Sequence, residues 1–182
     1  DDLVTGVQTC ALPISPTGTA SATLASGTED TAYVVSASDL LQGFSDVDGD
    51  TLAVSGLSSS SGTVTDNLDG TYTITPALNH NGSVTLSYNV VDGNGGTVAA
   101  SQSISLAATN DAPTGTASAT LASGTEDTAY VVSASDLLQG FSDVDTGDTL
   151  AVSGLSSSSG TVTDNLDRSE EHTSELQSPD HL

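Results

Sequence analysis

Basic residues are almost absent from this chain of 182 residues. Arg168 is the only Lys or Arg, beside 24 Asp and Glu, and the formal net charge is −23. Nucleic acids and anionic membrane surfaces are bound through Lys and Arg, so both are disfavoured as direct partners. The sequence also has no run of 18 apolar residues, so we expect no segment that inserts into a membrane. Cations are the natural partners of such a chain.

Cysteine is equally scarce, and its position is informative. Cys10 is the only cysteine, and it lies in a terminal segment whose composition differs from the rest, as do Arg168, His172 and His181. Residues 168–178 can be encoded by DNA whose reverse complement, extended by one base pair, encodes residues 4–14 in another frame. This DNA resembles the adapter used in short-read sequencing. We therefore interpret residues 1–14 and 168–182 as adapter-derived and exclude both from fold and function.

The remaining chain contains a long repeat. Pro16 to Asp48 recurs residue for residue as Pro113 to Asp145, and Gly49 to Asp69 recurs as Gly147 to Asp167, with Thr146 inserted between the two blocks. The period of 97 to 98 residues fits a complete small domain better than a solenoid turn. We therefore predict a complete repeat at residues 15–111 and a second, truncated repeat at 112–167. The native part has no cysteine, so neither a disulfide framework nor a Cys-based metal site is expected.

Apolar residues alternate with small polar ones throughout the first repeat, which is the period of a β-strand. Clusters of Gly, Asn, Asp and Ser separate these stretches as turns. The pattern predicts a helical turn at Ser38–Gln42 capped by Ser38, and seven strands near residues 17–24, 32–36, 51–56, 62–66, 70–75, 83–91 and 97–107. Seven short strands in about one hundred residues indicate an all-β, seven-stranded Greek-key sandwich of the cadherin or immunoglobulin kind.

Several motifs along the repeat carry a family resemblance. They are Thr28-Glu29-Asp30-Thr31, Phe44 to Leu52 (FSDVDGDTL), Asp69-Gly70-Thr71-Tyr72, Tyr88 to Gly96 (YNVVDGNGG) and the linker Thr109-Asn110-Asp111-Ala112-Pro113. Together they resemble the cadherin-like tandem repeats of large secreted bacterial adhesins, relatives of the VCBS and Rap-type repeats. The resemblance covers residues 16–167. It implies a secreted or cell-surface protein of the RTX adhesin kind, often type I-secreted and active in cell adhesion or biofilms, with calcium near the domain junctions.

The acidic residues gather at the two ends of the predicted sandwich. Because successive strands alternate in direction, Asp46, Asp48, Asp50 and Asp92 fall at the end that receives the incoming linker, which we call the N-terminal pole. Glu29, Asp30 and the linker residues Asn110 and Asp111 fall at the opposite, C-terminal pole. Calcium prefers six to eight oxygen ligands, and a carboxylate cluster without a cation repels itself. The clustering therefore predicts Ca²⁺ at the poles.

The family resemblance adds a ligand set for the junction between the repeats. It implies Glu29, Asp111, Asp143 and Asp145 as calcium ligands, with Asn110 giving a side-chain or backbone oxygen. We expect Asp148 to lie away from Asp143 and Asp145, because Thr146 is inserted before it. An EF-hand at residues 46–57 is excluded, because its last position is Leu57 instead of Glu and its flanks read as strands.

Other candidate residues have simpler interpretations. Asp66 and Asp69 have the positions of ordinary turn residues, and His80 lies between Asn79 and Asn81 with no second native His or Cys for a zinc site. Asn81-Gly82-Ser83 matches the glycosylation sequon, but we expect no modification. The aromatic residues of the first repeat are expected in its core, and they are Tyr33, Phe44, Tyr72 and Tyr88.

Three classes of function follow from these observations. The first is a calcium-stiffened structural or adhesive module whose partners are neighbouring repeats, other cells or extracellular polysaccharide. The second is a calcium-dependent carbohydrate-binding module, which exposed aromatic rings would favour. The third is a glycoside hydrolase with paired carboxylates in a cleft. No cleft is marked and no Gly-x-Ser-x-Gly elbow with a partnered His occurs, so we expect no enzyme. We also expect the truncated second repeat to be unstable alone.

Overall fold

The computed structural model describes residues 13–165 and 169–173. The chain divides into two compact units, unit 1 up to Thr109 and unit 2 from Asn110 onward, and each is described by itself. Most of the segments interpreted as adapter, and Asp167, lie outside the described residues. No helix in the described part is long and apolar enough to cross a membrane.

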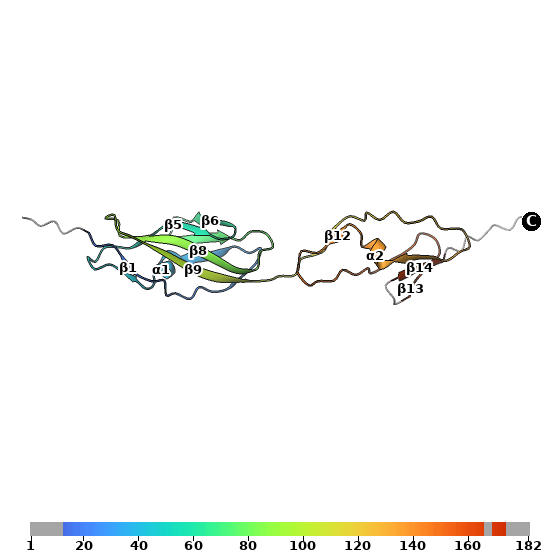
Figure 1. The fold of residues 1–182 in the computed structure, drawn as a ribbon, viewed down its shortest axis with the longest axis horizontal. Coiled ribbons are helices and arrows are strands. Elements are labelled where there is room, and N and C mark those ends of the chain that lie inside the picture. Colours follow the sequence, from blue (N-terminus) through green and yellow to red (C-terminus); the bar gives the residue numbers. More distant parts are fainter. Residues whose placement is uncertain (1–12, 166–168, 174–182) are drawn as a thin grey trace, which may run out of the picture. The chain divides into compact units, whose positions relative to one another are not determined.

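Unit 1 is an all-β sandwich in which every strand runs antiparallel to its sheet neighbours except β2 (Figure 1). The two main sheets have the orders β2-β9-β8-β5 and β3-β7-β6, and a third sheet pairs β1 with β4. The strands are β1 (Thr17–Gly18), β2 (Gly27–Thr28), β3 (Tyr33–Ser36), β4 (Phe44–Ser45), β5 (Ala53–Ser59), β6 (Thr63–Asp66), β7 (Thr71–Thr75), β8 (Gly82–Val91) and β9 (Thr97–Ala107).

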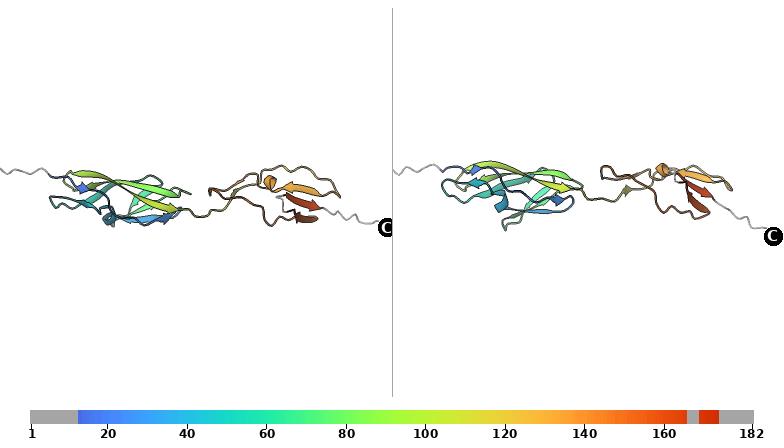
Figure 2. Two further views of the ribbon diagram at one scale, coloured as in Figure 1. Left: turned by 60° about the horizontal axis from the view of Figure 1, so that its bottom comes forward. Right: turned by 90° about the horizontal axis from the view of Figure 1, so that it is seen from below.

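The hairpin of β8 and β9 forms the centre of unit 1, and Figure 2 shows it from two further sides. Its ladder pairs Gly82 with Leu106 and continues without interruption to Val91 and Thr97. Alternate residues of β8 point inward, so its side chains are buried one by one along the strand. The core consists of Val84, Leu86, Tyr88 and Val90 of β8, Ile104 and Leu106 of β9, and Val35, Leu40 and Ile74 from the facing layer.

A single helical turn, α1 (Ala37–Leu40), follows β3 and leads to β4 in unit 1. Ser36 caps it, because the Ser36 hydroxyl accepts a hydrogen bond from Asp39 N at 3.1 Å and donates one to Asp39 Oδ2 at 2.6 Å. The turn places the fully buried Leu40 in the core, and the Leu40 carbonyl accepts a hydrogen bond of 2.6 Å from Tyr88 Oη. The cap is therefore Ser36, and the prediction of Ser38 was wrong.

Unit 2 repeats part of this architecture. Its elements are β10 (Thr114–Gly115), β11 (Tyr130–Ser133), α2 (Ala134–Leu137), β12 (Phe141–Ser142), β13 (Thr161–Asp164) and β14 (Ser169–Thr173). The sheet orders β10-β12 and β11-β14-β13 correspond to β1-β4 and β3-β7-β6 of unit 1. Unit 2 has no counterpart of β8 or β9 among its described residues.

The structure corrects two expectations about the strands. Unit 1 has nine strands in its described part instead of seven, because β2 and β4 were not predicted and the stretch predicted at 17–24 is paired only at β1. In addition, residues excluded as adapter-derived form β14, which pairs with β11 and β13. The pairing of Tyr130 with His172 repeats the pairing of Tyr33 with Ile74, so β14 occupies the register of β7.

Candidate metal centre

Three carboxylates meet at the N-terminal pole of unit 1. Asp46, Asp48 and Asp50 lie in the loop between β4 and β5, and each offers one carboxylate oxygen within 4.8 Å of the others. The loop is closed by a hydrogen bond of 2.8 Å from Asp48 N to Asp46 Oδ1, a turn that aspartate forms readily with its own backbone. Alternate residues of this loop therefore turn toward one point.

Asp92 lies at the same pole, directly after β8, because its neighbour Val91 pairs with Ala53 at the start of β5. Its side chain is buried, and Oδ1 accepts hydrogen bonds from the backbone nitrogens of Asn94 at 2.8 Å and Gly96 at 2.9 Å. Asn94 also connects the two loops, since its Nδ2 donates to Asp50 Oδ2 at 2.7 Å. Asp92 is thus tied to the acidic loop through Asn94.

Two carboxylate oxygens at this pole are buried without a hydrogen-bond partner among the described residues. They are Asp46 Oδ2 and Asp92 Oδ2. A buried polar atom without a partner is costly, and a buried anionic oxygen is more so. A hard cation such as Ca²⁺ coordinates oxygens of this kind. The donor set of this pole therefore fits calcium.

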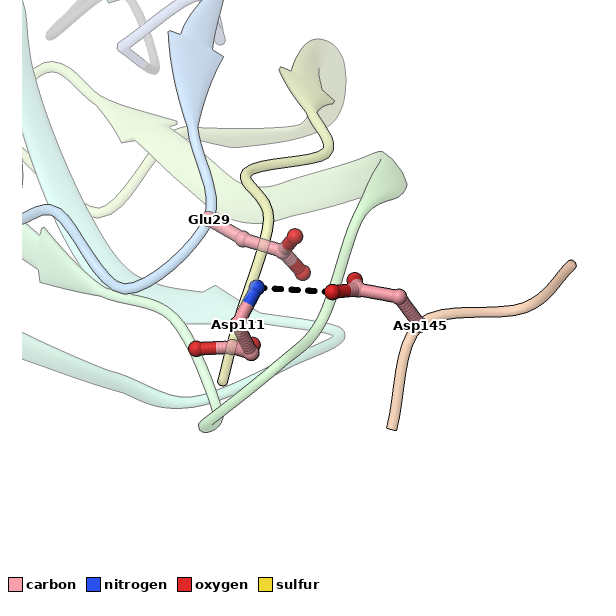
Figure 3. A group of neighbouring side chains, drawn as sticks. All are labelled: Glu29, Asp111 and Asp145. Carbon is pink, nitrogen blue, oxygen red and sulfur yellow. Dashed lines mark hydrogen bonds between the residues drawn. The ribbon is translucent and has the colours of Figure 1, made fainter. Parts of the chain in front are cut away.

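In each unit, the same loop binds the backbone of the segment that leads into the first strand of that unit. In unit 1, the backbone nitrogen of Ile14, the last residue of the segment interpreted as adapter-derived, donates to Asp48 Oδ2 at 2.8 Å. In unit 2, Asp111 N donates to Asp145 Oδ2 at 2.7 Å, as Figure 3 shows. Ile14 and Asp111 are 97 positions apart, so they occupy equivalent sites of the repeat. The Asp-x-Asp loop thus binds the incoming main chain in both units.

The N-terminal pole of unit 2 repeats the acidic cluster with one change. Asp143, Asp145 and Asp148 each offer a carboxylate oxygen within 4.8 Å of the others, and Asp145 N donates to Asp143 Oδ1 at 2.9 Å. We expected Thr146 to move Asp148 away from this group. The loop instead absorbs the insertion through a hydrogen bond of 3.3 Å from Asp148 N to the carbonyl of Asp145.

Glu29 is a buried acidic residue at the C-terminal pole of unit 1, with 2% of its surface exposed. It follows β2, and its own N–H donates to the carbonyl of Ala107 at the end of β9. Its Oε1 accepts a hydrogen bond of 2.7 Å from Thr109 N, and its Oε2 accepts a longer one of 3.4 Å from Asn81 Nδ2. Glu29 therefore holds the first residue of the linker that leaves unit 1.

The predicted ligand Asn110 and two other acidic residues singled out in the sequence have less distinctive surroundings. Asp30 has a φ of 55° and accepts a hydrogen bond from Asn79 N at 2.8 Å. Asn110 is exposed, and its Nδ2 donates to the carbonyl of Asp111 at 2.8 Å. The turn residue Asp69 accepts hydrogen bonds from the hydroxyl and the backbone nitrogen of Thr71, which together hold the pKa of Asp69 below its usual value.

Sequence reasoning missed the amide side chains that neighbour these carboxylates. Asn94 donates to Asp50 at one pole, and Asn81 donates to Glu29 at the other. Both residues precede a glycine, and both lie in turns that the sequence marked, but turn chemistry alone does not indicate which carboxylate an amide will meet. Only the pairing of the strands brings the partners together.

The chain has a limited likeness to solved structures. The endo-fucoidan hydrolase MfFcnA4 of glycoside hydrolase family 107 and a variant of the same enzyme are each 21% identical to it, with TM-scores of 0.39 and 0.38. Each match covers 88% of this chain and 24% of the enzyme chain, so the chain spans about a quarter of the length of these relatives. No curated protein matches the sequence.

A family model gives the more extensive match. The model of the cadherin-like domain matches residues 13–107 and again residues 109–175, which together make up most of the sequence. Each matched segment contains one Asp-x-Asp loop, at Asp46 and Asp48 in the first and at Asp143 and Asp145 in the second. The chain belongs to the cadherin-like domain family.

Proposed function

We propose that the chain is a calcium-binding structural and adhesive repeat module of a secreted bacterial surface protein. The observation that supports this most strongly is the anchoring of the linker by carboxylates of both units. Glu29 of unit 1 accepts a hydrogen bond from Thr109 N, and Asp145 of unit 2 accepts one from Asp111 N. Each anchor is a contact within its own unit.

Chain connectivity limits the separation of these two anchors. Thr109 and Asp111 are two residues apart, so their backbones are separated by at most about 7 Å. Carboxylates bonded to such closely spaced nitrogens repel one another unless a cation lies between them. We propose that Glu29, Asp111, Asp143 and Asp145 hold Ca²⁺ together with an oxygen of Asn110, and that Asp46, Asp48, Asp50 and Asp92 form the matching half-site for a preceding repeat.

Bound calcium would neutralise the carboxylates and connect the linker to both repeats. Glu29 and Asp145 would fix the linker backbone, while Asp143 and Asp111 would add negative oxygens. Without the cation, the acidic poles repel, and the linker is free to bend. The expected affinity is that of extracellular calcium modules, with a Kd of about 0.1–1 mM.

The main test uses a protein with two complete repeats, in which residues 70–107 are added to unit 2 after Asp167. Small-angle scattering is recorded with and without calcium at about ten times the expected Kd. We expect a more extended and more uniform particle with calcium. Identical scattering profiles under both conditions would rule out a calcium-stiffened spacer.

A pair of variants assigns the effect to the linker. Asp111→Ala removes a carboxylate between the repeats and is expected to weaken calcium binding at least several-fold in titration calorimetry, while each sandwich keeps its melting temperature. Asp66→Ala is the matched control, because Asp66 is the last residue of β6 and accepts a hydrogen bond from Leu68 N in the turn to β7. Equal losses for both variants would show that the junction has no special role.

The carbohydrate-binding alternative has less support. The aromatic residues of unit 1 pack against its core, Tyr88 with 4% of its surface exposed and Tyr33, Phe44 and Tyr72 partly buried. Sugar-binding surfaces usually present an aromatic face to the ligand. We therefore propose spacing and adhesion, with neighbouring repeats as the first partners, and we propose no enzymatic role.

A further inference from the structure

Strand β9 has a free edge along most of its length. In the sheet order β2-β9-β8-β5, one side of β9 pairs with β8 throughout, but on the other side only Leu106 and Ala107 pair with β2. Within the described residues, the stretch from Thr97 to Ser105 has no strand partner on that side. Its backbone N–H and C=O groups form a template to which another strand can pair.

The opposite edge of the same sheet is protected, and β9 is not. Edge strand β5 has a register shift between Ser55 and Ser58, and Gly56 there has a φ of 63°. A bulge of this kind twists a strand and prevents further pairing. β9 has an unbroken ladder and contains no Pro, no Gly and no charged residue. Of the two edges of this sheet, β9 therefore offers the flat and uncharged one among the described residues.

The distribution of charged residues also favours β9 as a site of pairing. The chain has a net charge of −23, yet neither β8 nor β9 contains a charged residue. The carboxylates described above lie in loops at the poles of the unit. Two copies of the chain repel through their poles, but they can approach along β9 without placing like charges opposite one another.

Gln102, in the middle of this edge, has an unusual environment. Its side chain follows the inward-pointing series of β9, opposite Leu86, and both Nε2 and Oε1 are buried without a hydrogen-bond partner among the described residues. A buried amide that makes no hydrogen bond costs free energy at both atoms. An incoming strand that supplies one acceptor and one donor at this position would remove that cost.

We propose that β9 pairs antiparallel with β9 of a second copy of this chain, around a two-fold axis at Gln102. In this register Gln102 lies opposite Gln102 of the second copy, and Ser101 lies opposite Ser103, so residues 99–105 of both copies pair without displacing β2. Side chains directly opposite each other in an antiparallel pair lie on the same face, about 5 Å apart. Each Gln102 amide then donates to the carbonyl oxygen of the other.

A second copy satisfies these requirements better than an unrelated strand. A two-fold axis through Gln102 presents each amide with an identical amide, which carries the complementary donor and acceptor. The incoming strand must also be flat and uncharged, as β9 is. The resulting contact joins chains side by side, whereas the proposed calcium sites join repeats end to end.

The association should respond to salt in a characteristic direction. Both copies are strongly acidic, so the long-range force between them is repulsive, and it is screened over about 10 Å in 0.1 M salt. We expect the dimer to be stronger in high salt than in low salt. Association through ion pairs would show the opposite dependence.

The test measures the dimerisation of the full chain by sedimentation velocity, with one pair of variants. Ser101→Glu places a charge on the free-edge strand and is expected to lower the dimerisation constant at least tenfold. Ser87→Glu is the matched control, because Ser87 is the cross-strand partner of Ser101, is also exposed and lies on β8, which is paired on both sides. The control is expected to dimerise as the wild type does. Equal losses for both variants, or a chain that stays monomeric at all salt concentrations, would overturn the proposal.

Gln102→Leu tests whether the Gln102 amide contributes to the dimer interface or only affects the stability of the monomer. The substitution removes a buried amide without a partner, so the melting temperature of the monomer should rise, while the dimerisation constant should fall because the amide pair is lost. A merely structural role predicts no change in dimerisation. A variant that is more stable and dimerises as well as the wild type would refute the register at Gln102.

Discussion

The two units share long stretches of identical sequence, yet only some of these stretches adopt the same structure. Residues 53–59 form strand β5 in unit 1, whereas the identical residues 151–157 form no strand in unit 2. Likewise, residues 27–28 form β2, and the identical residues 124–125 do not. In unit 1 these strands pair with β8 and β9, which have no described counterpart in unit 2.

Other elements are the same in both units. Helices α1 and α2 have the same cap, with distances of 3.1 Å from Asp39 N to Ser36 Oγ and from Asp136 N to Ser133 Oγ. Local hydrogen bonds between neighbours in sequence therefore persist without the central hairpin. The strands that are lost are those whose partners lie in the hairpin of β8 and β9, which shows that their β structure is imposed by tertiary contacts.

Equivalent apolar side chains are also buried to different extents in the two units. Leu40 is fully buried in unit 1, while its equivalent Leu137 is only partly buried. Leu121 and Phe141 are 45% and 38% exposed, whereas Leu24 and Phe44 pack partly buried against the core of unit 1. The hairpin of β8 and β9 thus supplies the surface that covers the apolar side chains of the other layer.

The largest expected effect comes from restoring this hairpin to unit 2. Adding residues 70–107 after Asp167 should turn residues 151–157 into a strand and convert unit 2 into a cooperatively folded domain, with a stability on the order of 5–15 kcal/mol. Amide hydrogen exchange of residues 151–157 measures the change. The control carries the same addition with Ser at the core positions of β8. Protection equal to that of the control would show that unit 2 does not need the hairpin.

A matched pair of core substitutions should give the next largest difference. Leu40→Ala removes a fully buried side chain and should destabilise unit 1 by about 2–5 kcal/mol. Leu137→Ala removes the same side chain from a partly covered site, so its effect on unit 2 should be less than half as large. Denaturant unfolding followed by hydrogen exchange separates the two units. Equal effects would contradict the difference in burial.

Tyr88→Phe tests a contact of unit 1 that has no counterpart among the described residues of unit 2. The Tyr88 hydroxyl donates to the Leu40 carbonyl, so its loss should destabilise unit 1 by about 1 kcal/mol. Burial raises the pKa of Tyr88 above 10.0, so the unfolded chain ionises first as the pH rises. The stabilisation is therefore complete below pH 10 and is lost as the pH rises through the higher pKa of the folded state.

The measurement for this prediction is the stability of unit 1 between about pH 9 and pH 12, a range that spans the ordinary tyrosine pKa of about 10. The wild type should lose stability over this range, and Tyr88→Phe should lose less. Unit 2, which has no equivalent tyrosine among its described residues, serves as the internal reference. A Tyr88→Phe protein with the same alkaline decline would assign that decline to other groups.

The smallest expected effect concerns the turn between β6 and β7. The hydroxyl and backbone nitrogen of Thr71 lower the pKa of Asp69, so the stabilisation from this carboxylate is present above pH 3.8 and is lost as the pH falls through the lower pKa of the folded state. Thr71→Val should move that pKa toward 3.8 in an NMR titration. Thr71→Ser, which keeps the hydroxyl, should leave it unchanged.

Alternation of apolar residues predicted the long strands well. The stretches expected at 83–91 and 97–107 agree closely with β8 and β9, and those at 62–66 and 70–75 agree with β6 and β7. The strand expected at 17–24 is limited to Thr17–Gly18. Beyond it, the backbone nitrogens of Thr19 and Ser21 donate to the carbonyls of Gly43 and Gln42 in a loop. Two-residue strands such as β2 and β4 carry too little pattern for a sequence prediction.

The polar sites were predictable only in outline. Strand direction placed Asp46, Asp48, Asp50 and Asp92 at one pole, and the structure has them there. The hydrogen bond from Asn94 to Asp50 depends on the relative position of two loops, which no spacing along the sequence encodes. The same is true of Gln102: the sequence shows only one more residue of a strand, and the structure is needed to show that its buried amide has no hydrogen-bond partner among the described residues.

The bond between the Asp-x-Asp loop and the preceding segment has a consequence for how such genes evolve. Asp48 and Asp145 both bind a backbone N–H, and the residue that provides it is Ile14 in one case and Asp111 in the other. This hydrogen bond is made by a backbone nitrogen and does not depend on the side chain, so different residues can occupy the position before the loop. In the proposed array, a repeat gained or lost by recombination would therefore meet a compatible neighbour, and the number of repeats could change without a change in this contact.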